Sequence, residues 1–110
     1  MTESKDSAKI FEALSSTPRR LILSYLSEAS LTSGQIAERF DMTRPALSKH
    51  LKILESAGLV EASKQGQFVH YSITEDNLVN TLVNFTANFC PKGSPLKKES
   101  KRISAEQKKQ

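Results

Sequence analysis

The stretch MTRPALSKHLKILESAGLVEASKQGQFVHYSI, residues 42–73, carries the signals that decide the fold. Thr43 is a favoured N-cap residue, and a stripe of leucines follows it at the spacing that lines one face of a helix. The leucines of this stripe are Leu47, Leu51 and Leu54. Gly58 then supplies the residue that commonly ends a helix in the left-handed conformation. A capped amphipathic helix is therefore predicted between Thr43 and Gly58.

Two short segments after this helix, LVEAS and FVHYSI, are rich in β-prone residues and are joined by KQGQ. Gly66 in the joining segment suits a tight turn, so the two segments are predicted to form a hairpin. Side chains alternate between the two faces of a strand. On that basis Val69, Tyr71 and Ile73 are expected to face the core.

Three further helices are predicted before this stretch and one after it. DSAKIFEALSS forms the first, and STPRRLILSYLSE forms the second. The second helix is expected to bury Leu21, Ile22, Tyr25 and Leu26. The third opens with a capping-box pattern from Thr32 to Gln35, and TEDNLVNTLVNFTANFC forms the last. The predicted fold is mainly α with a small β-hairpin, in the order of four helices, two strands and a final helix.

The net charge of +4 over 110 residues is unevenly distributed. Residues 1–90 hold 9 Lys and Arg against 10 Asp and Glu, whereas residues 91–110 hold 7 against 2. The length indicates one folded domain, assigned to residues 1–90. Residues 91–110 are almost free of apolar side chains, so they are predicted to be a basic disordered tail.

The single cysteine, Cys90, cannot form an internal disulfide, which fits a reducing compartment. No apolar run is long enough to span a bilayer, and the first residues lack the apolar core of a signal peptide. The protein is therefore expected to be cytoplasmic, without membrane insertion.

The side of the predicted helix opposite its leucines is polar and basic. Arg44, Ser48 and Lys49 offer the long cations and short donors that suit base edges in a DNA major groove. Thr43 and Lys52 are better placed for phosphates. Pro45 lies on the same side. The helix before it, the turn FDMT and this helix together form a helix-turn-helix, whose second helix enters the groove.

The predicted hairpin tip is also polar and basic. Lys64, Gln65 and Gln67 surround the turn and are expected to lie along a neighbouring phosphate backbone or minor groove. A solvated helix face beside an ordinary hairpin is the alternative interpretation. The combination of caps, turn and hairpin favours double-stranded DNA as the partner.

These segments resemble the arsenic-repressor (ArsR) family of bacterial winged-helix transcription factors. The resemblance covers residues 8–90 and is carried by LSSTPRRLILSYL, TSGQIAERFDMTRPALSKHLKILESAGLV and KQGQFVHYSI. It implies a winged helix-turn-helix homodimer that represses transcription and forms dimer contacts through its first and last helices. Recognition positions map onto Arg44, Pro45, Ser48 and Lys49, although Pro45 stands where such proteins often carry a serine.

The last helix predicts a dimer on independent grounds. It carries a stripe of large apolar residues and further valines beside that stripe, which is more apolar surface than one small domain covers. A helix that is simply buried within the monomer is the alternative. The residues predicted at the dimer interface are Ile10, Phe11, Leu78, Leu82, Phe85 and Phe89.

Sensing sites of the family are incomplete in this chain, so no metal site and no cofactor are predicted. Thr32 to Glu38 contains no cysteine, and no histidine follows Asp76 in the last helix. Cys90 is a candidate redox residue without an early partner in its own chain. The branch that lacks a metal site implies a protein partner that controls release from DNA.

Three other classes of protein are alternatives to a DNA-binding repressor. They are a winged helix used only for protein–protein interaction, a thiol-based redox regulator and a MarR-type winged helix, which usually has a longer chain. The chain is not expected to be an enzyme, because it contains no catalytic triad, phosphate-binding glycine loop or paired carboxylates suited to a cleft.

Overall fold

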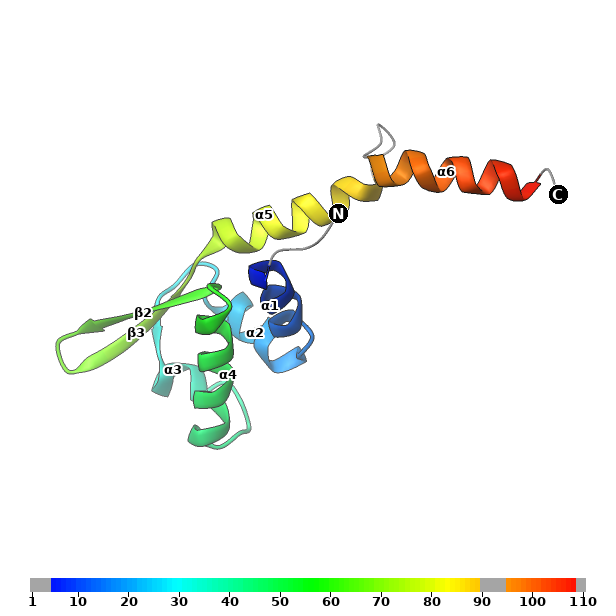
Figure 1. The fold of residues 1–110 in the computed structure, drawn as a ribbon. Helices are drawn as coiled ribbons and strands as arrows, with labels where there is room; N and C mark the ends of the chain where they lie inside the picture. The colour runs from blue at the N-terminus through cyan, green and yellow to red at the C-terminus, as the bar shows by residue number, and fades with distance from the viewer. Residues whose placement is uncertain (1–4, 90–94, 109–110) are drawn as a thin grey trace. The chain divides into compact units, whose positions relative to one another are not determined.

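The computed structural model describes residues 5–89 and 95–108 (Figure 1). Contacts divide the chain into two compact units, Met1–Leu78 and Val79–Gln110. The helices of the first unit are α1 (Lys5–Leu14), α2 (Thr17–Tyr25), α3 (Ser33–Ala37) and α4 (Arg44–Ser56). Its strands are β1 (Leu31–Thr32), β2 (Val60–Gln65) and β3 (Phe68–Ile73). Helix α5 (Glu75–Thr86) begins in this unit, and a short 3₁₀ helix, η1 (Ala87–Phe89), and α6 (Pro95–Lys108) follow it.

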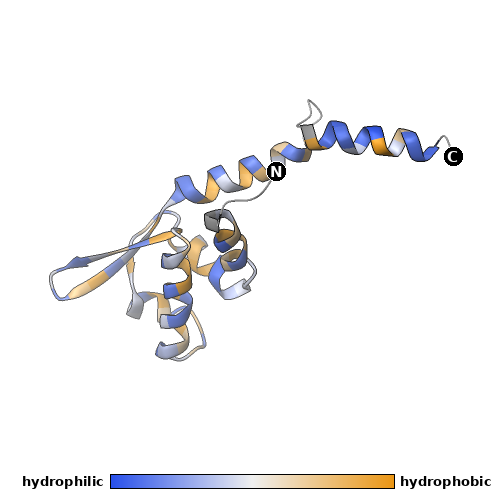
Figure 2. Cartoon of the chain, in the orientation of Figure 1, coloured by the Kyte–Doolittle hydropathy of each residue, from blue (hydrophilic) through white to orange (hydrophobic). Residues whose placement is uncertain are grey.

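The core of the first unit is built around α4. Leu47, Leu51 and Leu54 are buried, as their spacing predicted, and they pack with apolar residues from α1, α2, α3 and the start of β2. Figure 2 shows polar and apolar residues alternating along α4, as a helix with one buried face requires. The remaining buried residues are Ile10, Ala13, Ile22, Leu23, Leu26, Ile36, Ala57, Leu59 and Val60.

Helix α2 buries a narrower face than its sequence predicted. Ile22 and Leu26 are buried, but Leu21 and Tyr25 are exposed. Leu23 is buried in their place. Because α2 packs mainly against α1 and α4, only the side facing those helices is covered, and the wider stripe extends into solvent.

The sheet has three antiparallel strands in the order β1-β3-β2. The predicted hairpin is confirmed, with Val60 opposite Ile73 at its base and Gln65 opposite Phe68 at its tip. Gly66 turns the chain there with a φ of 64°. The additional strand β1 pairs only Leu31 and Thr32 with β3. Two residues are too few to show a period of two in the sequence, so β1 was not predicted.

The prediction of a disordered tail was wrong for residues 95–108, which form α6. Pro95 suits the first turn of a helix, and the Lys, Glu, Ala and Gln residues that follow are good helix formers. Arg102 forms an ion pair with Glu99 one turn before it and with Glu106 one turn after it. Such pairs stabilise a helix whose residues are mostly hydrophilic, as Figure 2 shows for α6.

The Leu54 side chain is predicted to contribute far more to the free energy of unfolding than the side chain of the neighbouring Ile53. Leu54 is 0% exposed and Ile53 is 39% exposed. Leu54→Ala should lower the free energy of unfolding by about 2–5 kcal/mol, because it leaves a cavity in the core. Ile53→Ala should lower it by about 0.5–1 kcal/mol. Urea denaturation at one fixed protein concentration measures both values. Equal losses would contradict the orientation of α4, in which Leu54 faces the core and Ile53 faces the solvent.

Candidate nucleic-acid interface

Two capped helices form the helix-turn-helix of the first unit. The backbone N–H of Gln35 donates to Thr32 Oγ1 at 3.2 Å, and the Thr32 N–H donates to Gln35 Oε1 at 2.9 Å, which confirms the predicted capping box of α3. Thr43 caps α4 as predicted, since its Oγ1 accepts from the Ala46 N–H at 3.2 Å. These caps hold the start of each helix at a defined residue.

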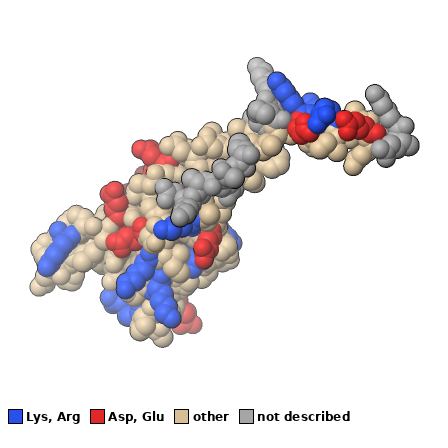
Figure 3. Space-filling model, in the orientation of Figure 1, with Lys and Arg blue, Asp and Glu red and all other residues tan. Residues whose placement is uncertain are grey.

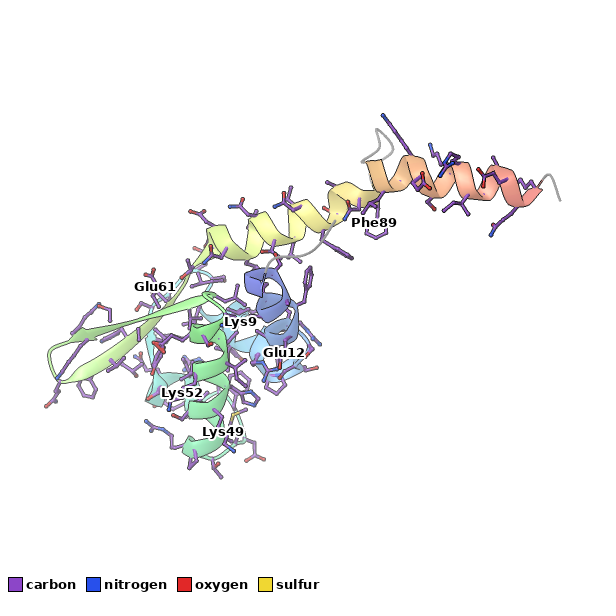
Figure 4. The ribbon with its side chains drawn as sticks, viewed as in Figure 1. Lys9, Glu12, Lys49, Lys52, Glu61 and Phe89 are labelled. Carbon is purple, nitrogen blue, oxygen red and sulfur yellow. The ribbon has the colours of Figure 1, made fainter. Side chains whose placement is uncertain are left out.

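The solvent-facing side of α4 brings most of the predicted contact residues together. These residues are exposed, whereas the leucine side of the same helix is buried. Lys49 and Lys52 both stand on α4 (Figure 4), and Figure 3 shows Lys and Arg side chains gathered over this part of the molecule. The predicted residues on this side are Thr43, Arg44, Pro45, Ser48, Lys49 and Lys52.

A groove of about 320 Å³ lies between α4, the start of α3 and strand β3. Within it, Arg44 Nη2 donates to Ser33 Oγ at 2.9 Å. Ser33 and Tyr71 were not among the predicted contact residues, because each is far from Arg44 in sequence and no helical or strand period connects them. The lining residues are Ser33, Arg44, Pro45, Leu47, Ser48, Leu51 and Tyr71.

The hairpin tip extends past the helices that cover the base of the sheet (Figure 1). Lys64, Gln65 and Gln67 are all exposed there. Val69, which was predicted to face the core, is exposed as well, because no helix covers this end of the hairpin. The tip therefore carries one lysine and two amide side chains on a projecting arm.

Three lysines of this surface are free of ion pairs with the described residues, so they are open to a partner. Within the part of the chain that the structure describes, Lys49, Lys52 and Lys64 form no ion pair with a carboxylate. The arginines behind the surface are engaged by the fold instead. Arg39 donates to the Gln35 carbonyl at 2.7 Å and lies 6.0 Å from the centre of the Tyr25 ring.

Arg19 joins α1, α2 and α4. Its Nε and Nη2 donate to the carbonyl oxygens of Ala13 and Glu12, at 2.8 and 3.2 Å, and its Nη1 lies 3.2 Å from His50 Nδ1. Arginine has only donors, so Nδ1 of His50 accepts and the ring is neutral. Desolvation by burial, and then the charge of Arg19, lower the pKa of His50 below 6.5.

The residues predicted at a dimer interface divide into three groups by their exposure. Leu82, Phe85 and Phe89 are exposed, and the rings of the last two meet edge to face with their centres 5.2 Å apart. Phe11 and Leu78 are half-buried. Ile10 is only 3% exposed and belongs to the core, so its side chain offers no surface to a partner, contrary to its prediction. Cys90 lies outside the described residues.

The described residues contain neither a cluster suited to a metal ion nor a helix suited to a membrane. Across residues 5–89 and 95–108, no three His, Cys, Asp or Glu side chains are grouped so that they could hold a metal ion. None of the helices described combines the length and apolar character needed to cross a bilayer.

These features define a winged helix-turn-helix domain of the DNA-binding type, and the comparisons agree. Residues 16–62 match the family of bacterial regulatory proteins named arsR. The transcriptional repressor SdpR of Bacillus subtilis is 38% identical over 84 residues, which cover 76% of this chain and 92% of that protein. The chain belongs to the ArsR family.

Solved structures show the same fold. An ArsR-like transcriptional regulator from Rhodococcus sp. RHA1 matches 94% of this chain and 91% of its own, with a TM-score of 0.73 and 28% identity. A homodimeric winged helix-turn-helix DNA-binding domain from Mycobacterium bovis matches 78% of this chain and 85% of its own, with a TM-score of 0.62 and 28% identity.

The neutral state of His50 predicts a pH-dependent stability. Because its pKa is lower in the folded than in the unfolded chain, the unfolded state binds more protons in the interval between the two values. Its contribution is complete above pH 6.5 and is lost as the pH falls through the folded pKa. The melting temperature of the wild type should therefore drop more between pH 7.5 and 5.5 than that of His50→Gln. Equal drops would refute this role of His50.

Proposed function

We propose that the protein is a transcriptional repressor that binds double-stranded DNA as a homodimer and reads base edges with the first turns of α4. The observation that carries the proposal is the division of α4 into a buried leucine face and an exposed face with Arg44, Ser48 and Lys49. The family membership supports it, and so does the name of the B. subtilis relative as a repressor.

Different residues are assigned different roles on DNA. Arg44, Ser48 and Lys49 are assigned to base edges, where arginine and lysine commonly contact guanine. Thr43 and Lys52 are assigned to phosphates. Pro45 presents a ring without an N–H donor, so it can add only apolar contact or shape. Lys64, Gln65 and Gln67 of the hairpin lie along a neighbouring backbone or minor groove in this proposal.

A homodimer explains the exposed apolar surface of the last helix. Large side chains that are open to solvent at several positions of one helix usually meet a partner. The residues proposed to contact the partner subunit are Phe11 and Leu78 in the first unit, and Leu82, Phe85 and Phe89 in the second. Two-fold symmetry then requires a pseudo-palindromic operator with half-sites about one helical turn apart.

The cellular setting follows from this proposal. The regulator acts in the cytoplasm, where its target DNA lies, and it has no enzymatic activity. DNA binding by the surface described requires no metal ion and no organic cofactor. Release from DNA by a protein partner is retained as a hypothesis. A winged helix that serves only protein–protein interaction is disfavoured. Three lysines that form no ion pair among the described residues lie on the helix and hairpin that meet DNA in DNA-binding winged helices.

Arg44→Ala and Lys52→Ala should change DNA binding in different ways. Loss of a base contact costs about 1–3 kcal/mol per site, so Arg44→Ala should collapse the ratio of affinities for operator and random DNA. Loss of a phosphate contact weakens all binding, so Lys52→Ala should lower the salt slope by about two in a dimer. Salt titrations with both DNAs measure each effect. An intact ratio in Arg44→Ala would exclude α4 as the reader.

Leu82→Asp should produce monomers that bind operator poorly, because it places a charge within the proposed apolar interface. Leu82 is 38% exposed. Leu21→Asp is the matched control, since Leu21 is an exposed leucine on α2, outside that interface. Light scattering at micromolar concentration reports the mass of each variant. A monomeric wild type, or dimeric Leu82→Asp, would argue against this interface.

A further inference from the structure

Arg44 differs from the other cations assigned to DNA in having a side-chain partner on another helix. Its Nη2 donates to Ser33 Oγ at 2.9 Å. Among the described residues, Lys49, Lys52 and Lys64 donate no hydrogen bond to a neighbouring side chain. The guanidinium of Arg44 therefore has a protein partner in the absence of DNA, whereas the ammonium groups of these lysines have none among the described residues.

Ser33 sits on a part of α3 that is itself fixed. It directly follows Thr32, whose side chain and backbone are both engaged by Gln35 in the capping box. Ile36, one turn later, is completely buried and anchors α3 in the core. The backbone of Ser33 therefore has a position set by two independent constraints, and the bond from Arg44 then orients its hydroxyl.

Gly34 lies beside the guanidinium of Arg44. A Cβ atom at this position would lie 3.8 Å from Arg44 Nη1, in ordinary van der Waals contact. The Arg44 side chain thus lies over the start of α3, with one nitrogen bonded to Ser33 and the other above Gly34. This arrangement forms the wall of the groove between α3, α4 and β3.

The chemistry of guanidinium makes this contact relevant to base reading. The group is planar and has five N–H donors in fixed directions, so one bond to Ser33 restricts the plane and leaves donors on its other edges. A bidentate contact with guanine needs two donors in one defined direction. Ordering a long side chain on binding costs affinity, and an earlier restraint removes part of that cost.

We propose that Ser33 is a positioning residue, which orients Arg44 for the base that it reads and thereby sets specificity at one position of each half-site. This inference rests on the proposed function, because it assigns no contact with DNA to Ser33 itself. The hydroxyl acts through Arg44 alone.

A double-mutant cycle tests the proposal with an operator selected from random DNA by the wild-type protein. The variants are Ser33→Ala, Ser33→Thr, Arg44→Ala and the Ser33→Ala/Arg44→Ala double variant. Ser30→Ala is the control, an exposed serine in the loop before β1. Each variant is measured for its operator-to-random affinity ratio, its salt slope and its melting temperature.

Ser33→Ala should lower the operator-to-random ratio by about five- to a hundredfold, since a dimer loses the restraint twice. Its salt slope and melting temperature should match those of Ser30→Ala, because no charge and no buried group is lost. Ser33→Thr, which keeps the hydroxyl, should restore the ratio. In the Arg44→Ala background, Ser33→Ala should have no further effect.

Two results would overturn the inference while the proposed function stands. One is an unchanged ratio in Ser33→Ala alongside a collapsed ratio in Arg44→Ala. The other is an equal loss from Ser33→Ala with and without Arg44, which would mean that Ser33 acts independently. An unchanged ratio in Arg44→Ala would overturn the proposed function itself, and the inference with it.

Discussion

Burial of three leucines on one side of α4 determines which side chains of that helix face the solvent. Leu47, Leu51 and Leu54 are each at most 2% exposed, so a rotation of α4 about its axis would expose apolar surface. That cost holds Arg44 and Lys49 on the outside. Burial of the leucines thus determines both the core and the surface that is proposed to read DNA.

The ends of the helices then decide where along the axis the contacts begin. Thr43 fixes the first turn of α4, and Thr32 fixes the first turn of α3 beside it. Their geometry brings Ser33 and Arg44 within hydrogen-bond distance, although eleven positions separate them in the chain. Arg19 of α2 contacts His50 of α4 and donates to two carbonyl oxygens of α1, so it links these three helices. Residues that stabilise the fold therefore also orient the side chains that are proposed to contact bases.

The sequence was sufficient to predict features set by local patterns: the caps at Thr32 and Thr43, the stripe of α4 and the hairpin turn at Gly66. It failed where neighbouring elements decide exposure. Leu21 and Tyr25 lie on an apolar stripe that no other helix covers in the first unit, and Ile10 is enclosed by the core rather than left for a partner. Composition alone suggested disorder for the last residues, because it gave no weight to the ion pairs of Arg102. The bond between Ser33 and Arg44 depends on tertiary packing, and no pattern in the sequence signals it.

In the proposed complex, the outer face of α4 and the hairpin tip meet DNA. The most direct measurement is a titration of the ¹⁵N-labelled full chain with an operator duplex, followed by backbone amide chemical shifts in NMR spectra. The largest changes in chemical shift should fall at residues 43–52 and 64–67, with smaller changes at Ser33. Shifts confined to the basic helix α6, with α4 unchanged, would contradict the proposed complex, because they would mean that DNA is held by charge alone.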